Sequence, residues 1–128
     1  MLFRSTFTGA VDGAKDLTVN SSGATVFSAA VGATTALTSL TTDVGGNLTL
    51  SGVSTTGNQT YGENTTVTLS GNFSTNNNAF TINAATTVLS GGTNVSAGTG
   101  NVSFAGTVDG AQALTVNSTG AKIGRAHV

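Results

Sequence analysis

Apolar and polar residues alternate in short runs along this chain, and Gly, Asn or Asp separates the runs. Within residues 7–19, large apolar residues alternate with small or polar ones on both sides of Asp12-Gly13. Alternation with a period of two is typical of a strand with one buried face. Asp-Gly favours a type I′ turn, because both central positions of that turn need positive φ. The pattern predicts two short strands joined by a tight turn.

The runs recur at intervals of about 20 residues, which is typical of a repeat architecture. A unit of this length, made of short strands and turns, describes one rung of a β-solenoid, in which each rung contacts only its neighbours. We therefore predict an all-β fold, a β-solenoid in the form of a right-handed parallel β-helix, with roughly five to six rungs of roughly 20 residues. The alternative is a β-sandwich, which also has many regularly spaced short strands but gives no reason for the repeat.

The inward positions of the runs form the predicted core, and the two Asp-Gly pairs form predicted turns. The core residues are Phe7, Val11, Leu17, Val19, Phe27, Leu37, Leu48, Leu50, Val67, Leu69, Phe80, Ile82, Val102, Phe104, Val108, Leu114 and Val116, and the turn residues are Asp12, Gly13, Asp109 and Gly110.

One unit of 18 residues occurs twice, as FTGAVDGAKDLTVNSSGA at residues 7–24 and as FAGTVDGAQALTVNSTGA at residues 104–121. The offset between the copies is 97 residues. With rungs of roughly 20 residues, this offset indicates a higher-order repeat of about five rungs. We expect the two copies to occupy equivalent places.

The composition narrows the possible partners. Only 7% of the 128 residues are charged, the net charge is −1, and there are 18 Gly, no Pro and no Cys. Scattered Lys and Arg give no electrostatic footprint for nucleic acid or for an anionic membrane. No apolar run approaches the ~18 residues of a membrane helix, so we expect no membrane insertion by this segment. Stacking in register also accounts for the low charge, because like charges would lie a strand spacing apart.

The acidic residues and the single Tyr offer little chemistry at this stage. Asp12, Asp109 and Asp43 precede Gly or Val-Gly-Gly and are interpreted as turn formers. Tyr61 is interpreted as part of a polar loop, and Glu63 as solvated. The neighbours Lys15 and Asp16 are also expected in solvent.

β-Helical polysaccharide lyases and hydrolases are the main enzymatic rivals. Such sites need clustered carboxylates with Arg or Lys on one face, whereas the charged residues here are spread singly. We therefore predict no catalytic, cofactor-binding or metal-binding residue, no cofactor, and a protein that is not an enzyme. A carbohydrate-binding or carbohydrate-processing β-helix is the alternative.

Eight Asn-x-Ser/Thr sequons exceed the number expected by chance for this composition. Strands of the form Asn-apolar-Thr would generate them without any glycan, and we favour that interpretation over glycosylation. The possible acceptors are Asn20, Asn47, Asn58, Asn64, Asn72, Asn94, Asn101 and Asn117.

Two Thr-x-Thr pairs are similar to those of ice-binding solenoids. They are Thr6 with Thr8 and Thr66 with Thr68. An ice-binding face needs the pair on nearly every rung, so this function is a remote alternative.

The two ends differ from the rest of the chain. MLFRS at residues 1–5 and IGRAHV at residues 123–128 resemble translations of the two strands of a common sequencing adapter. Foreign ends are excluded from fold reasoning. We expect residues 6–122 to be a β-solenoid repeat segment of a longer array, and residues 1–5 and 123–128 not to be native.

The motif F-x-G-x-V-x-G-x-x-x-L-T-V-N-S-x-G resembles the repeats of filamentous haemagglutinin-like adhesins, which two-partner secretion exports, and of related autotransporter passengers. The resemblance covers residues 6–121. It implies a right-handed β-helical shaft of a large bacterial exoprotein, secreted or held at the surface of a Gram-negative-type cell, with a role in adhesion. Its partners would be the neighbouring repeats of the same polypeptide and an unidentified host or surface ligand.

Overall fold

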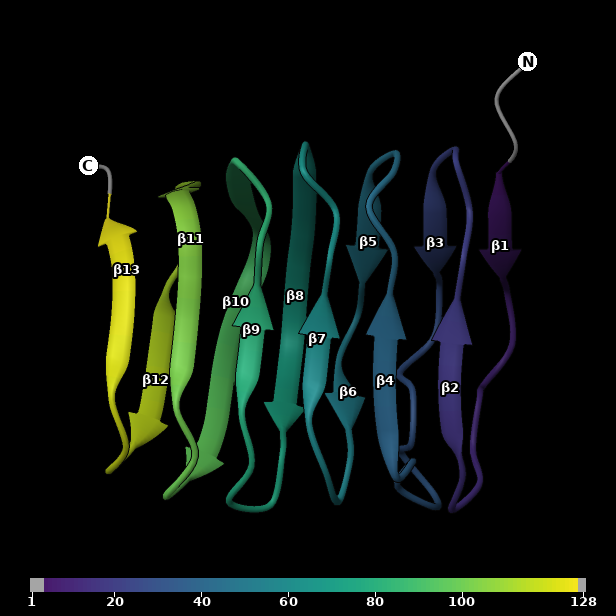
Figure 1. The fold of residues 1–128 in the computed structure, drawn as a ribbon, viewed down its shortest axis with the longest axis horizontal. Helices are drawn as coiled ribbons and strands as arrows, with labels where there is room; N and C mark the ends of the chain where they lie inside the picture. Colours follow the sequence, from purple (N-terminus) through teal and green to yellow (C-terminus); the bar gives the residue numbers. More distant parts are fainter. Residues whose placement is uncertain (1–3, 127–128) are drawn as a thin grey trace.

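The computed structural model describes residues 4–126, and within that range it contains thirteen β-strands and no helix (Figure 1). The strands are β1 (Ser5–Phe7), β2 (Asp16–Val19), β3 (Thr25–Phe27), β4 (Ser39–Thr42), β5 (Leu48–Leu50), β6 (Val53–Ser54), β7 (Gln59–Tyr61), β8 (Thr66–Ser74), β9 (Phe80–Ile82), β10 (Thr86–Gly98), β11 (Val102–Asp109), β12 (Leu114–Ser118) and β13 (Lys122–Ala126).

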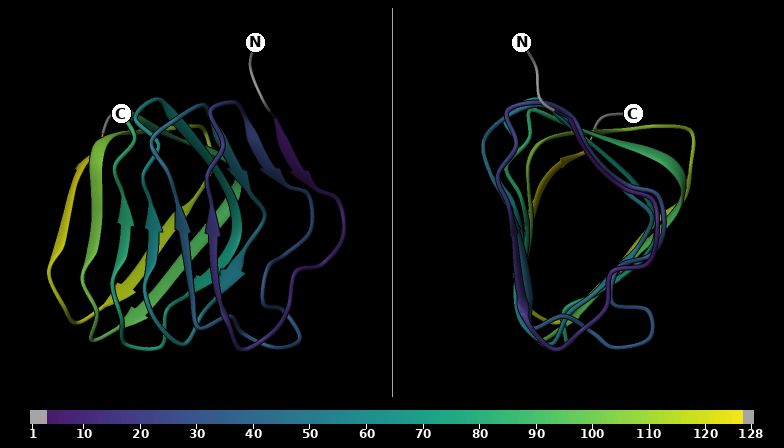
Figure 2. Two further views of the ribbon diagram at one scale, coloured as in Figure 1. Left: turned by 45° about the vertical axis from the view of Figure 1, so that its right-hand side comes forward. Right: turned by 90° about the vertical axis from the view of Figure 1, so that its right-hand side faces the viewer.

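The strands wind into a tube with three faces, and every ladder between strands is parallel. Face A stacks β1, β3, β5, the first parts of β8 and β10, and the last parts of β11 and β13. Face B stacks β2, β4, β7, β9, the first part of β11 and the first part of β13. Face C stacks β6, the last parts of β8 and β10, and β12. Viewed along the tube, the coils superpose in a triangular outline (Figure 2).

The chain makes about six turns, with about 21 residues between equivalent positions. This confirms the β-solenoid prediction, and the parallel pairing excludes the sandwich, whose sheets are antiparallel. Neighbouring coils are ~4.8 Å apart, the usual strand spacing. The inward column of face C shows the register best: Val11, Val31, Val53, Phe73, Val95 and Val116.

The apolar core is the inside of the tube, because alternate residues of each strand point inward and stack on the coil below. On face A, Leu50 pairs with Leu69, which pairs with Leu89. On face B, Phe80 pairs with Val102. All five side chains are buried.

The predicted type I′ hairpin at Asp12-Gly13 is wrong. Gly13 has φ +133° and Gly110 has φ +126°, but neither Asp12 nor Asp109 has positive φ. The Asp-Gly pairs instead turn corners between faces, because the strands that they join lie on different faces and do not pair.

The two copies of the 18-residue unit do not occupy equivalent places, which corrects the expected five-rung repeat. Phe7 lies on face A and Phe104 on face B; Val108 lies on face A, whereas its counterpart Val11 lies on face C. An offset of 97 residues falls between four and five coils of about 21 residues. The second copy is therefore displaced by one face.

Candidate functional site

Most of the predicted core residues lie inside the tube. Those that the structure buries are Val19, Phe27, Leu37, Leu48, Leu50, Val67, Leu69, Phe80, Ile82, Val102 and Phe104. Those that are partly buried and pack against this core are Phe7, Val11, Leu17, Val108, Leu114 and Val116. Five of these six belong to the first and last coils, where a neighbouring coil covers one side only, whereas Val108 pairs with Thr87 on one side and with the small Ala126 on the other.

Nine further hydrophobic side chains are buried inside the tube and were absent from the predicted core: Val31, Leu40, Val53, Tyr61, Phe73, Ala84, Leu89, Val95 and Ala97. The spacing of the coils could have identified them as core residues, because Val31 and Val95 lie about 21 residues from predicted core positions in the same column. Local alternation alone does not find them, because corners of variable length separate the runs.

Tyr61 lies inside the tube, so its assignment to a polar loop is wrong. Its hydroxyl donates a hydrogen bond to Gln59 Oε1 at 2.8 Å, and Gln59 Nε2 donates to Ser74 O at 2.9 Å and to Val53 O at 3.1 Å. Burial raises the pKa of Tyr61 well above its usual value, and the charge of Glu63 adds to this shift. This network stabilises the corner between faces B and C, because buried polar groups need partners.

Glu63 is also buried, at 1% exposure, which corrects its assignment to solvent. The alternation of face B places Gln59, Tyr61 and Glu63 inward in succession, and this was the available signal. The hydroxyl of Thr42 on the coil below donates to Glu63 Oε2 at 2.8 Å. Burial raises the pKa of Glu63; the bond from Thr42 opposes the shift, and the charge of Asp43 adds to it.

Asp and Asn side chains at the corners bind the backbone of the neighbouring coil. Asp12 Oδ1 accepts hydrogen bonds from the backbone N–H groups of Thr34 and Thr35 at 2.9 and 3.0 Å. Four similar bonds tie Asp43 to Ser21, Asn58 to Ala79, Asn77 to Thr99 and Asn101 to Ala121, at 3.1, 2.9, 3.1 and 2.9 Å. These side chains therefore hold one coil to the next. Lys15 and Asp16 are exposed, and Asp16 accepts a bond from the Ser39 hydroxyl at 2.6 Å.

The sequons follow the alternation of the strands. Their central residues are buried in six of the eight, namely Ser21, Leu48, Gln59, Phe73, Val95 and Val102. The amide Nδ2 of Asn117 donates to Asn94 Oδ1 at 3.3 Å on face C. Glycosylation at any of the eight Asn stays a prediction.

Outward hydroxyl groups form a single column on face B. It consists of Thr18, Thr41, Thr60, Thr81 and Ser103 in register. On face A, Val26 and Val88 interrupt the corresponding column around Thr49 and Thr68. The Thr-x-Thr pair at Thr66 and Thr68 is therefore not continued as a pair on the adjacent coils.

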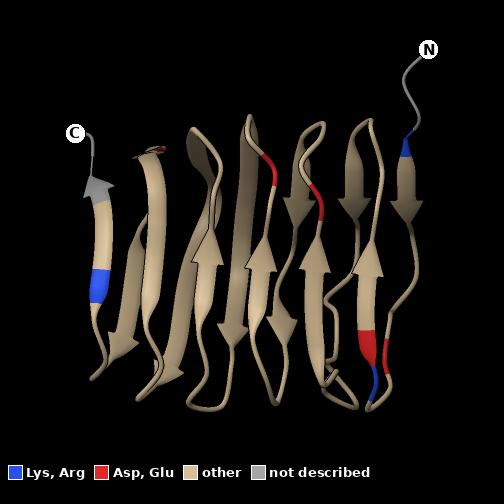
Figure 3. Ribbon diagram, viewed as in Figure 1, with Lys and Arg blue, Asp and Glu red and all other residues tan. Residues whose placement is uncertain are grey.

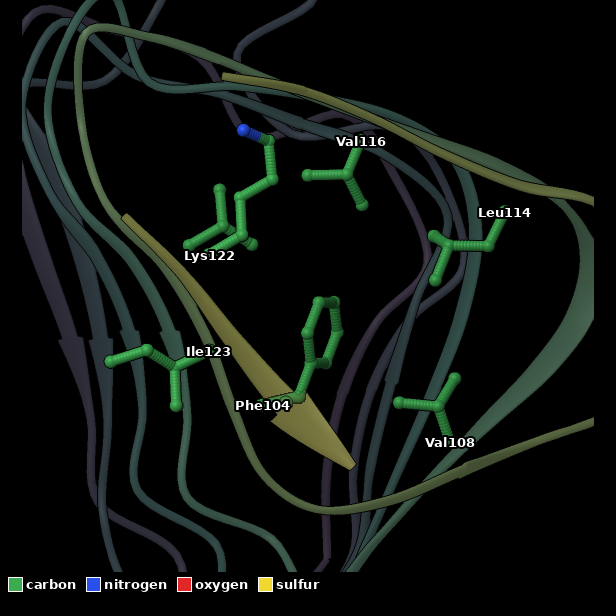
Figure 4. Close-up of a pocket in the computed structure, with 8 residues that line it drawn as sticks. Phe104, Val108, Leu114, Val116, Lys122 and Ile123 are labelled. Atoms are coloured by element: carbon green, nitrogen blue, oxygen red, sulfur yellow. The ribbon is translucent and has the colours of Figure 1, made fainter. Parts of the chain in front are cut away.

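A hollow of the described chain lies at the open C-terminal end of the tube, which we call the C-terminal mouth. Its volume is about 330 Å³, and its lining is mainly apolar. Figure 4 shows Phe104, Val108, Leu114 and Val116 pointing into this space, with the stem of Lys122 at its edge. Lys122 occupies an inward column position, because it pairs with Val102.

No family model, curated protein or solved structure matches this chain. Within residues 4–126, no three His, Cys, Asp or Glu side chains gather where they could hold a metal ion. The same residues contain no helix long and apolar enough to span a membrane. Figure 3 shows the charged residues spread along the tube, mostly at its corners and ends.

Proposed function

We propose that this chain is a non-enzymatic structural segment, part of the shaft of a large exported bacterial adhesin. The observation that supports the proposal is the continuous stack of parallel coils, whose outlines are all roughly triangular (Figure 2). Such a stack can be lengthened coil by coil without a new core, because each coil contacts only its neighbours. A shaft of this kind holds a distal binding element away from the cell.

The polar residues that the structure describes support a mechanical role. Asp12 and Asp43 hold adjacent coils together, and Glu63 is buried against Thr42. The motif of residues 7–24 and 104–121 supports the adhesin class by its resemblance to haemagglutinin-like repeats. In the proposal, neighbouring repeats of the same polypeptide contact this segment, and the protein is secreted or held at the cell surface.

The test is recovery of the complete natural reading frame around residues 6–122. The proposal expects further coils of about 21 residues on both sides and a secretion domain upstream. Cells that express the complete protein should display this segment to an antibody without permeabilisation. A complete frame that encodes an isolated domain, or an antibody signal seen only after permeabilisation, would refute the proposal.

A further inference from the structure

The two ends of the tube expose strands that pair on one side only. Among the described residues, β1 pairs with β3 alone and β2 with β4 alone at the N-terminal end. At the C-terminal end, β12 pairs with β10 alone and β13 with β11 alone. Unpaired strand edges template pairing with another chain. Both ends are therefore potential contact surfaces.

The apolar side chains at these ends are incompletely covered. Phe73 and Val95 lie in the middle of the face C column and are 0% exposed, whereas Val116 at its C-terminal end is only partly buried. The C-terminal mouth, of about 330 Å³, lies beside Val116. At the other end Phe7 stacks on Phe27 with ring centroids 4.5 Å apart and is also only partly buried.

The two ends complement each other in strand direction. All strands of one face run in the same direction, so the first coil of one molecule can continue the ladder of the last coil of another only head to tail. The coils share a roughly triangular outline along the tube, and the last coils reach further out at one corner than the first coils do (Figure 2). Lys122 at the C-terminal mouth would meet a first coil that carries Asp12 and Asp16 together with Arg4 and Lys15, so the charges of that coil balance and the contact relies on strand pairing and apolar stacking (Figure 3).

We infer that the C-terminal mouth binds the N-terminal coil of a second copy of this chain. The contact repeats the coil-to-coil packing that already occurs inside the molecule, where inward apolar side chains stack and parallel strands pair. It joins different surfaces of the two copies, so it does not close and it produces linear oligomers. This inference goes beyond the proposed function, because it concerns the chain by itself and requires neither an adhesin nor a cell.

The experiment compares the full 128-residue chain with one charged variant at each end. Leu114→Lys places an ammonium in the C-terminal mouth, and Val11→Lys places one in the first coil. Thr60→Lys, on the outer surface of face B, is the matched control. Sedimentation velocity over a hundredfold range of concentration gives the mass distribution, and far-UV circular dichroism checks that each variant retains its β-structure.

The unmodified chain and the Thr60→Lys variant should form multiples of the 12.5 kDa monomer that grow with concentration. Each end variant should remain a monomer alone, and their equimolar mixture should form a dimer and nothing larger, since one intact mouth then meets one intact first coil. If Val11→Lys does not fold, Leu17→Lys replaces it at the same end.

Three outcomes would overturn the inference. They are an unmodified chain that stays monomeric throughout, an end variant that associates by itself, and a mixture that stays monomeric. None of these outcomes bears on the reading-frame test of the proposed function.

Discussion

Replacing Phe80 with Ala removes the central ring of the aromatic cluster inside the tube. Phe80 is 0% exposed, and its ring lies 5.7 Å from Tyr61, 5.7 Å from Phe73 and 5.9 Å from Phe104 between centroids. Truncating a buried Phe to Ala costs about 3–5 kcal/mol of unfolding free energy. Tilted and edge-to-face pairs contribute about 0.5–1.5 kcal/mol each beyond area burial, so we expect a value near the upper limit.

Phe7→Ala is the matched control, because Phe7 makes one stacked ring contact and is only partly buried. Its cost should be about half as large, since the burial part of the cost scales with the area removed from water. Urea denaturation followed by far-UV circular dichroism measures both variants. Tyr61 fluorescence reports on the cluster directly, because the chain has one Tyr and no Trp. Equal costs for the two variants would refute the buried aromatic cluster.

Other predictions concern single side chains in the coils. Glu63 has a raised pKa in the folded state, so it favours folding below the usual carboxyl pKa, and this contribution is lost as pH rises through the folded pKa. Glu63→Gln should therefore flatten the pH dependence of unfolding and stabilise the protein at neutral pH. A variant whose urea midpoint equals that of the unmodified chain at both pH 5 and pH 8 would contradict this. Asp12→Ala should cost about 1 kcal/mol in urea denaturation, because two exposed cross-coil bonds are lost. Gly110→Ala should lower the melting temperature more than Gly13→Ala, since both have positive φ but only at Gly110 would a Cβ lie 2.6 Å from Leu89 O; equal shifts would argue against this close approach. A thermal-hysteresis assay should show no ice shaping, because the paired Thr columns are interrupted on face A.

The alternation of residue types predicted strands and many of the inward positions, and the recurrence of the runs at about one coil length predicted the stacked coils. Leu48 and Leu50 pair with Val67 and Leu69 as the spacing suggested, and Phe27 pairs with Phe7. These pairs could be predicted because their runs are strongly apolar and their spacing is close to one coil.

The polar interior could not be predicted in the same way. Alternation places Gln59 and Glu63 at inward positions, but polar side chains are usually exposed, and the burial of these two depends on partners from other coils, Ser74 and Thr42. The C-terminal mouth could not be predicted from the sequence either, because its position depends on which faces the last strands cover. Corner lengths determine this, and they vary from coil to coil: Leu17 and Leu40 are 23 residues apart, whereas Leu40 and Gln59 are 19 apart.

The displacement of the second 18-residue copy by one face has a genetic consequence. An exchange between equivalent points of the two copies, with loss or gain of the 97 residues between them, would keep the reading frame and the alternation of strands. The coils on either side would still stack. Everything that follows the junction, however, would be turned by about a third of a revolution around the long axis, since each coil is one full revolution. Such an exchange would therefore change the direction in which later parts of the chain point, as well as the length of the rod.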